Sequence, residues 1–306
     1  MTERVCVVGA GSIGSLLAAH LSRVADVSVL VRREEHAQAL NEQGLRVSGR
    51  AEFTAEVRAA VDPDELPEPQ LAILACKGPE VAAVADRISG RWSGATVMTV
   101  QNGLGAEATV AERGAWPILA ALTFMSGTRH SDTHVEYVLD TATWIGPGRG
   151  TTAADARAVA ELILAGGLKA EAYEDIAPVR WSKLIFNATV NGVAALTGLR
   201  HDFHFAAEER PSDLGHLVRG LIDEGKAVAA AAGLVLHEDP WQMNVLATQR
   251  GHAHYPSMLE DVDARRPTEL ETINGALVRE AERLGVSVPL QRAIYRLVKA
   301  KEASYL

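Results

Sequence analysis

The stretch Val5-Cys6-Val7-Val8-Gly9-Ala10-Gly11-Ser12-Ile13-Gly14 decides the fold of the first half of this chain. Its first four residues have the length and the β-branched composition of a buried parallel strand. The next six match the pattern Gly-x-Gly-x-x-Gly, and a helical repeat of leucines follows directly. A strand, a glycine turn and a helix in this order form the setting in which the pattern binds a dinucleotide. A purely structural glycine turn is the alternative.

Each position of this pattern has a physical role in a dinucleotide site. Gly9 permits the tight turn, Gly11 lets the backbone approach a pyrophosphate, and Gly14 lets the helix pack against the strand. The helix N-terminus, which begins at Ser12 and Ile13, offers unpaired N–H groups and the positive end of the helix dipole to the phosphates.

The residues after the second strand, residues 27–31, decide which dinucleotide fits. An NAD site usually has an acidic residue there, which binds the ribose 2′-hydroxyl. This chain has Arg32-Arg33 at that position. A guanidinium pairs with a 2′-phosphate, which a carboxylate would repel, so the sequence predicts NADP(H) as cofactor. Two solvated surface arginines are the alternative.

Two more apolar runs, residues 71–76 and 95–100, are typical of buried strands, and a polar residue closely follows each. Lys77 follows the first and Asn102 the second. Ligands of doubly wound sheets bind beyond the carboxyl ends of the strands. We therefore expect Lys77 to meet a phosphate or a substrate anion and Asn102 to hold a ribose or a carboxamide. Taken alone, Asn102-Gly103 would be only a turn.

The strand signals stop near Ile176. Before that point, residues 118–145 alternate as antiparallel edge strands do, residues 152–165 have a helical pattern, and residues 168–173 resemble a last strand. Helical patterns then cover residues 177–197, 213–232, 241–250, 257–264, 268–284 and 288–303. The sequence predicts an α/β Rossmann domain over residues 1–174 and an all-α domain over residues 175–306.

Two stretches match a helix capping box, Ser257–Glu260 and Thr268–Glu271. They predict that Ser257 and Thr268 cap the helices that follow them. Glu269 would then lie in a first helical turn, where the dipole favours a carboxylate. A helix N-terminus at Ser257 could also bind a substrate carboxylate, and the two roles are compatible.

A polar stripe marks the first helix of the second half. Lys183, Asn187 and Asn191 are four residues apart, so they share one helix face over about 12 Å. Their neighbours are apolar, and a polar stripe is expensive to bury without partners. By itself, the stripe fits a solvent-exposed face better than a site.

Composition excludes several classes of protein. The chain has 306 residues and a formal charge of −9, which argues against nucleic acid or an anionic membrane as the main partner. No apolar run is long enough to span a bilayer, and the N-terminus has no signal-peptide layout, so we expect a cytoplasmic protein. Cys6 and Cys76 lie in apolar runs and are expected to be buried, with no metal site or disulfide. The irregular stretch 200–211 is expected to be a surface loop.

Four motifs in this order resemble the ketopantoate reductase (2-dehydropantoate 2-reductase) family over nearly the whole chain. They are Gly9–Gly14, Gln101–Gly105, Lys183–Asn191, and Ser257–Val262 leading to Arg266–Gly275. The resemblance implies NADPH-dependent reduction of 2-dehydropantoate to pantoate, a step of pantothenate and coenzyme A biosynthesis. It also implies that the first domain binds NADP(H), that the second carries substrate and catalytic residues, and that the active site lies in the cleft between them.

The resemblance assigns roles by position. Lys183 would be the general acid and Glu269 its partner. The substrate's carboxylate and hydroxyl would be held by Asn187, Asn191 and Ser257. The phosphates of NADPH would be bound by Arg32 and Lys77. Asn102 would touch both the cofactor and the substrate, and Glu269 would also contact the cofactor. Asp261 lies in a matching motif without an assigned role.

Alternative functions remain open at this stage. Another 2-hydroxyacid or opine-type dehydrogenase of the same architecture would keep Lys183 and differ in substrate. A non-catalytic NADP(H) sensor would not need Lys183 and Glu269, and a purely structural role would leave the motifs unexplained. The sequence also leaves open the substrate itself, the stereochemistry, and whether the protein is a monomer or a homodimer.

Overall fold

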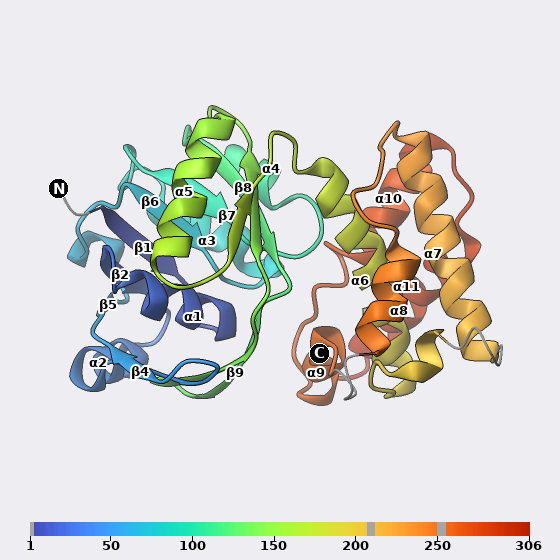
Figure 1. Ribbon diagram of the computed structural model, residues 1–306, viewed down its shortest axis with the longest axis horizontal. Coiled ribbons are helices and arrows are strands. Elements are labelled where there is room, and N and C mark those ends of the chain that lie inside the picture. The colour runs from blue at the N-terminus through green and yellow to red at the C-terminus, as the bar shows by residue number, and fades with distance from the viewer. Residues whose placement is uncertain (1–2, 207–211, 250–254) are drawn as a thin grey trace. The chain divides into compact units, whose positions relative to one another are not determined.

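The computed structural model describes residues 3–206, 212–249 and 255–306. The chain divides into two compact units, one of Met1–Gln101 and Ala106–Ile176, the other of Asn102–Gly105 and Ala177–Leu306. The first is an α/β unit and the second is helical, which confirms the predicted fold class (Figure 1).

An eight-stranded sheet forms the centre of the first unit. Neighbouring strands are parallel except that β11 runs antiparallel to β8. From edge to edge the strands are β12 (Ala170–Ala172), β11 (Thr143–Pro147), β8 (Ile118–Thr123), β7 (Thr96–Thr99), β6 (Leu71–Leu74), β1 (Arg4–Val8), β2 (Asp26–Leu30) and β5 (Arg58–Ala60).

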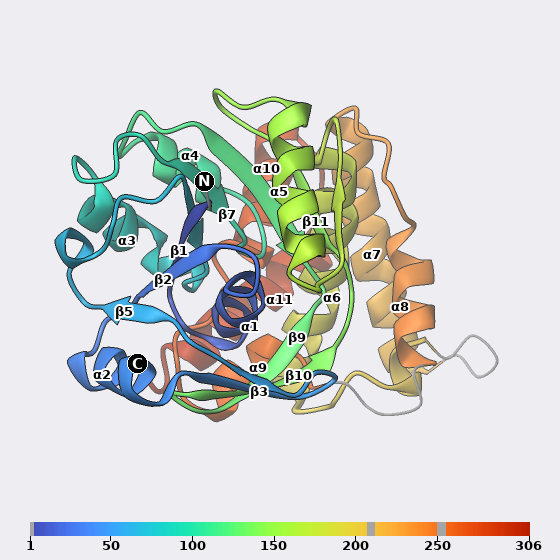
Figure 2. The ribbon, with the colours of Figure 1, turned by 60° about the vertical axis from the view of Figure 1, so that its left-hand side comes forward.

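Both faces of this sheet are covered, which explains why its central strands are apolar throughout. Val5 and Val7 of β1 face the core built with α1 (Ser12–Leu21), α2 (Glu34–Gln43) and α5 (Ala153–Ala165). Cys6 and Val8 face the opposite core, built with α3 (Val81–Ile88) and α4 (Ala106–Ala111). Figure 2 shows α1 and α5 in front of the sheet.

A second, four-stranded sheet was not predicted. Its order is β4 (Phe53–Ala55), β3 (Leu45–Gly49), β10 (His134–Leu139) and β9 (Ser126–Ser131). The expected antiparallel pairing within residues 118–145 is found twice, between β8 and β11 near one edge of the large sheet and between β9 and β10 in the second sheet. Because β10 also pairs parallel with β3, β9 and β10 belong to this separate sheet rather than to the edge of the large one. Short 3-10 turns are η1 (Pro63–Glu65) and η2 (Gly78–Glu80).

The helical unit is built around α6 (Ala177–Thr197), which packs against every longer helix of the unit. Residues 179 and 181–195 of α6 are buried, so its polar residues are buried with the rest. The surrounding helices are α7 (Asp213–Ala231), α8 (Pro240–Thr248), α9 (Ser257–Asp263), α10 (Asn274–Leu284) and α11 (Pro289–Glu302), with a 3-10 turn η3 (Phe203–Ala206). Along the described part of the chain, no helix is both long and apolar enough to cross a bilayer.

Two of the predicted helix starts are wrong. The N-cap of α9 is Pro256, and no side chain makes a capping hydrogen bond there, so Ser257 is not a cap. The helix expected from Thr268 begins at Asn274 instead, and residues 269–273 form turns. The Thr268 hydroxyl accepts a hydrogen bond from the Leu270 N–H, which closes a local turn in place of a helix cap.

The predicted surface loop at residues 200–211 is partly wrong. His201 is 1% exposed and hydrogen-bonds Asn244, with 2.9 Å between its Nε2 and the Asn244 Oδ1. Residues 207–211 lie outside the described residues. Cys6 is buried as expected, whereas Cys76 is only half-buried.

The turn between β1 and α1 yields a stability prediction. A Cβ at Gly14 would lie 1.9 Å from the Gly9 carbonyl oxygen, whereas a Cβ at Gly11 would meet nothing within 4 Å. We expect Gly14→Ala to lower the free energy of unfolding by about 1–3 kcal/mol, because overpacking displaces the turn. Gly11→Ala is the matched control and should unfold like the wild type in a denaturant titration. Equal stability of the two variants would contradict this account.

Candidate active site

The residues expected to bind the dinucleotide follow the carboxyl ends of four neighbouring strands. The glycine turn follows β1, Arg32 follows β2, Lys77 follows β6, and Asn102 follows β7. These strands are parallel and adjacent, so their ends lie at the same edge of the sheet. The chain turns in opposite directions on either side of β1, which is the topological switch point where such sheets bind ligands.

The glycine turn fits a pyrophosphate. Gly9 has a φ of +100°, which suits glycine, and its N–H donates to the Leu30 carbonyl at 2.9 Å. Gly11 is the N-cap of α1, and no side chain caps the helix there. The first N–H groups of α1, at Ser12, Ile13 and Gly14, are thus left for an anion, and the space beside Gly11 is open.

The two arginines after β2 differ in their surroundings. Arg32 is exposed and forms an ion pair with Glu80, at the end of η2 and three residues beyond Lys77. Arg33 donates two hydrogen bonds to Asp132, at 2.6 and 2.8 Å. Arg32 is therefore next to the Lys77 segment, whereas Arg33 is engaged elsewhere. Sequence reasoning missed Glu80, because a pairing across two separate loops leaves no local signal.

Gln101 is another residue that sequence reasoning passed over. It is buried, and its amide donates to the carbonyl oxygens of Leu74 at 2.6 Å and Cys76 at 3.0 Å. The side chain thus ties the end of β7 to the end of β6 and fixes the backbone just before Asn102. Its place in the resembling motif Gln101–Gly105 was the available signal.

The polar stripe of α6 is buried, which rules out the solvent-exposed alternative. Lys183 is 6% exposed, Asn187 9% and Asn191 6%. All three lie on one face of a helix that is covered along its length. Burying a cation and two amides on one helix face costs folding free energy unless these groups find hydrogen-bonding or charged partners.

Lys183 has a shifted pKa. Burial lowers it from 10.5 to about 8, and the negative charge of Glu269 partly opposes that shift. An ammonium with a pKa near neutrality can both donate a proton and regain one at physiological pH. Lys183 and Glu269 therefore interact electrostatically within the helical unit, and this interaction helps to set the pKa of Lys183.

Glu269 is held in the turn that precedes α10 and is 7% exposed. Its Oε2 accepts a hydrogen bond of 2.9 Å from the Asn102 amide. The Asn102 loop is fixed by a second contact, since the Leu104 N–H donates to the Thr272 carbonyl at 2.9 Å. The structure thus brings Asn102, Lys183 and Glu269 together within one compact unit, although 167 residues separate Asn102 from Glu269.

The segment around α9 holds the last expected residues. Ser257 is half-buried at the first turn of α9 and its hydroxyl makes no capping bond. Asp261, without an assigned role from the sequence, has a 3% exposed side chain that pairs with Arg266 at 3.0 Å. That ion pair connects the C-terminal part of α9 to the segment that leads to Glu269.

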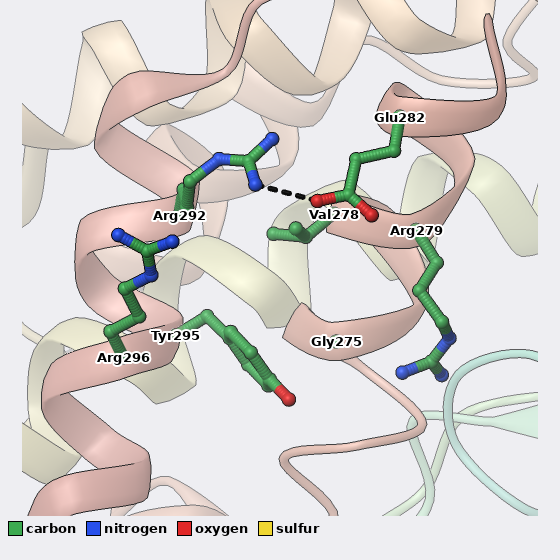
Figure 3. A pocket seen from close by; sticks show the side chains of 7 residues that line it. All are labelled: Gly275, Val278, Arg279, Glu282, Arg292, Tyr295 and Arg296. Atoms are coloured by element: carbon green, nitrogen blue, oxygen red, sulfur yellow. Dashed lines mark hydrogen bonds and ion pairs between the residues drawn. The ribbon is translucent and has the colours of Figure 1, made fainter.

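A cavity of about 240 Å³ lies elsewhere in the helical unit, between α10 and α11 (Figure 3). It is lined by Gly275, Val278, Arg279, Glu282, Arg292, Tyr295 and Arg296. Its charges are largely paired already, because Arg292 binds Glu282 at 2.5 Å and Arg279 binds Glu271 at 3.2 Å. None of the expected site residues lines this cavity.

Comparisons with known proteins cover both units. Residues 5–150 match the family described as ketopantoate reductase PanE/ApbA, and residues 175–302 match its C-terminal counterpart. The chain is 30% identical to 2-dehydropantoate 2-reductase of Halobacterium salinarum, over 97% of this chain and 98% of that protein.

Solved structures share the fold. The 2-dehydropantoate 2-reductase of Methylococcus capsulatus is 26% identical with a TM-score of 0.85, over 99% of this chain and 97% of that one. D-mandelate dehydrogenase, solved with NADH and anilino(oxo)acetate, is 23% identical with a TM-score of 0.87, over 99% of both chains. Two family matches that together span most of the chain, and a relative at 30% identity over nearly its full length, establish that this protein belongs to the ketopantoate reductase family.

Proposed function

We propose that this protein reduces a 2-keto acid to the 2-hydroxy acid with NADPH, and that its substrate is 2-dehydropantoate, which becomes pantoate. The observation that carries the proposal is the buried Lys183, whose pKa of about 8 is set by burial and by Glu269. A sensor that only binds a nucleotide would have no use for such a group. The relatives named 2-dehydropantoate 2-reductase support the choice of substrate.

The residues of the helical unit would handle the proton. When bound, the reduced nicotinamide supplies a hydride to C2 of the keto acid. The Lys183 ammonium donates a hydrogen bond to the keto oxygen and transfers its proton as negative charge develops there. Glu269 keeps the buried amine protonated, and Asn102 holds the Glu269 carboxylate in place.

The substrate's polar groups would be met by side chains that can both donate and accept. Asn187 and Asn191 follow Lys183 along the same face of α6, and an amide can serve a hydroxyl and a carboxylate alike. The Ser257 hydroxyl makes no capping bond and can donate to the carboxylate. In the first unit, the uncapped N-terminus of α1 would hold the pyrophosphate, with Arg32 and Lys77 near the adenosine phosphates.

A second candidate is reduction of a different 2-keto acid by the same machinery. Lys183 and the two amides on the same face of α6 would serve the keto and carboxylate groups that all 2-keto acids share, so this candidate needs no other helical unit. The expected opine-type or 2-hydroxyacid dehydrogenases would share Lys183 and differ in the keto acid that they accept.

A panel of keto acids separates these candidates. We expect NADPH oxidation to be fastest, by kcat/KM, with 2-dehydropantoate, and slower with pyruvate and benzoylformate. Initial rates followed at the absorbance of NADPH give this ranking. A higher kcat/KM for benzoylformate would move the assignment to the second candidate, and no turnover with any keto acid would contradict the reductase function.

Removal of the proton donor should abolish most of the rate. Lys183→Ala should lower kcat by about 10²–10⁴ while NADPH affinity stays near that of the wild type. Lys183→Arg should restore little, because a guanidinium does not release its proton at these pH values. The control is Lys226→Ala, which removes a surface lysine paired with Asp239 and should leave kcat unchanged. Wild-type turnover by Lys183→Ala would end the catalytic role of this residue.

The preference for NADPH over NADH should depend on Arg32, and the ion pair with Glu80 should weaken that preference. Loss of a charge-assisted hydrogen bond costs about 1.5–3 kcal/mol, so Arg32→Ala should weaken NADPH binding about 10- to 100-fold and leave NADH binding unchanged. Glu80→Gln should strengthen NADPH binding, because it frees the guanidinium. Arg33→Ala is the matched control, since Arg33 pairs with Asp132. Titration of each variant with both nucleotides checks this, and equal wild-type affinity for NADH and NADPH would refute it.

Substrate anchoring should reside in Asn191 and Ser257. Asn191→Ala and Ser257→Ala should raise KM for the keto acid more than they lower kcat, because ground-state contacts are lost. Ser257→Ala should not lower the melting temperature, since this hydroxyl caps no helix.

The matched control is Ser212→Ala. The Ser212 hydroxyl does cap α7, accepting from the Gly215 N–H at 3.0 Å. Its removal should cost about 1 kcal/mol of stability and leave KM unchanged. An unchanged KM in Ser257→Ala would remove Ser257 from the substrate site.

A further inference from the structure

Asn274, the first residue of α10, is fully buried and reaches into the backbone of α6. Its Nδ2 donates a hydrogen bond of 2.6 Å to the main-chain oxygen of Ala188. Ala188 lies between Asn187 and Asn191 on α6, and Asn274 lies five residues after Glu269. One side chain therefore joins the turn that carries Glu269 to the helix that carries Lys183.

Gly192 lets two elements lie close to α6. A Cβ at Gly192 would lie 2.5 Å from Cγ2 of Ile294 in α11 and 3.2 Å from Nδ2 of Asn274, so it would clash with Ile294 and press on the Asn274 amide. Gly192 thus forms a notch on α6 against which α11 and the start of α10 both pack. A notch of this kind fixes the position of the docked turn along the helix as well as its distance from it.

The turn between Glu269 and Asn274 is tightly tied, so that a shift at one end reaches the other. The Ile273 N–H donates to the Glu269 carbonyl at 3.0 Å, and the Gly275 N–H donates to the Leu270 carbonyl at 2.9 Å. On its outer side, Glu271 accepts hydrogen bonds of 2.8 Å from Tyr295 and 2.7 Å from Lys299. The hydrogen bond from Asn274 to Ala188 then connects this turn to α6.

The Asn274 amide is kept at a cost to stability. Its Oδ1 is buried and, in the described part of the chain, has no hydrogen-bond partner. An unsatisfied buried acceptor destabilises the folded state, whereas an apolar side chain of similar size would carry no such penalty. A residue that is unfavourable for packing yet placed beside the catalytic pair points to a functional constraint.

We propose that Asn274 is a positioning residue, which holds Glu269 against Lys183 by fixing the Glu269–Gly275 turn to the backbone of α6. The inference rests on the proposed function for its catalytic consequence. Asn274 itself touches neither Lys183 nor the substrate; it acts through Glu269.

The charged groups around α6 make the pKa of Lys183 a suitable readout. Burial lowers that pKa and Glu269 raises it. Asp261 of α9 is the other buried carboxylate among the described residues of this unit, and Arg266 engages it. Displacement of Glu269 should therefore lower the pKa of Lys183 further, whereas a general loss of stability should not.

The test compares Asn274→Leu with Asn244→Leu. Asn244 is the matched control, because it is also fully buried in the helical unit and also donates to a main-chain oxygen, that of Phe205 at 3.0 Å. The pKa of Lys183 is measured by NMR titration of the whole apo-protein with labelled lysine. The chain has six lysines, and Lys183→Ala identifies the signal.

We expect the pKa of Lys183 to fall by about one unit in Asn274→Leu, approaching the value in Glu269→Gln, and to stay unchanged in Asn244→Leu. In turnover, kcat/KM at pH 8 should fall about fivefold for Asn274→Leu, because a pKa lower by one unit leaves a smaller fraction of Lys183 protonated. A folded Asn274→Leu protein with the wild-type pKa of Lys183 would overturn the inference. Should that variant not fold, Asn274→Ala, which removes the same hydrogen bond with a smaller side chain, is read in the same way.

The titration needs no substrate, so it separates this inference from the proposed function. A wild type that reduces no keto acid, but whose Lys183 responds to Asn274, would overturn the function and keep the positioning role. An active wild type in which the pKa of Lys183 does not change on substitution of Asn274 would keep the function and overturn the positioning role.

Discussion

The burial of one cation, the Lys183 ammonium, is the constraint on which the helical unit depends. A lysine within α6 can remain charged only if something offsets the loss of water, and Glu269 supplies that offset. Glu269 comes from a turn rather than a helix, so the turn must be fixed to α6 by other means. Asn102 at the carboxylate and Asn274 at the backbone provide these contacts.

The first unit follows a different constraint, the close approach of backbone to backbone at the β1–α1 turn. Gly14 packs against Gly9 and leaves no room for a side chain, while the space beside Gly11 is open. The helix that begins there lacks a side-chain cap, which weakens the free protein and leaves N–H groups for a pyrophosphate. Function thus accounts for features that are unfavourable for stability alone, in this unit as in the other.

Strong periodicity made the fold predictable, and local ambiguity explains the errors. The glycine pattern after an apolar strand and the long helical repeats led to the right architecture. The second sheet was missed because β4 has only three residues and β3 only five, so the alternation of buried and exposed residues in β3 is too short to stand out in the sequence. The two capping boxes failed in different ways, because α9 begins with Pro256 at its N-cap and the Thr268 hydroxyl closes a local turn instead of capping a helix. The site was harder: the spacing of Lys183, Asn187 and Asn191 was visible, but their burial, the Glu80 pairing and the Asn274 contact depend on segments far apart in sequence.

The pH dependence of kcat/KM, measured in the wild type and in Glu269→Gln, tests the central claim most directly. A general acid works only while protonated, and kcat/KM reports the free enzyme, so kcat/KM should fall as pH rises through the pKa of Lys183, about 8. Glu269 raises that pKa, so its neutralisation should move the decline to lower pH. A kcat/KM that stays constant well above pH 8, or a decline at the same pH in both proteins, would contradict the role of this pair.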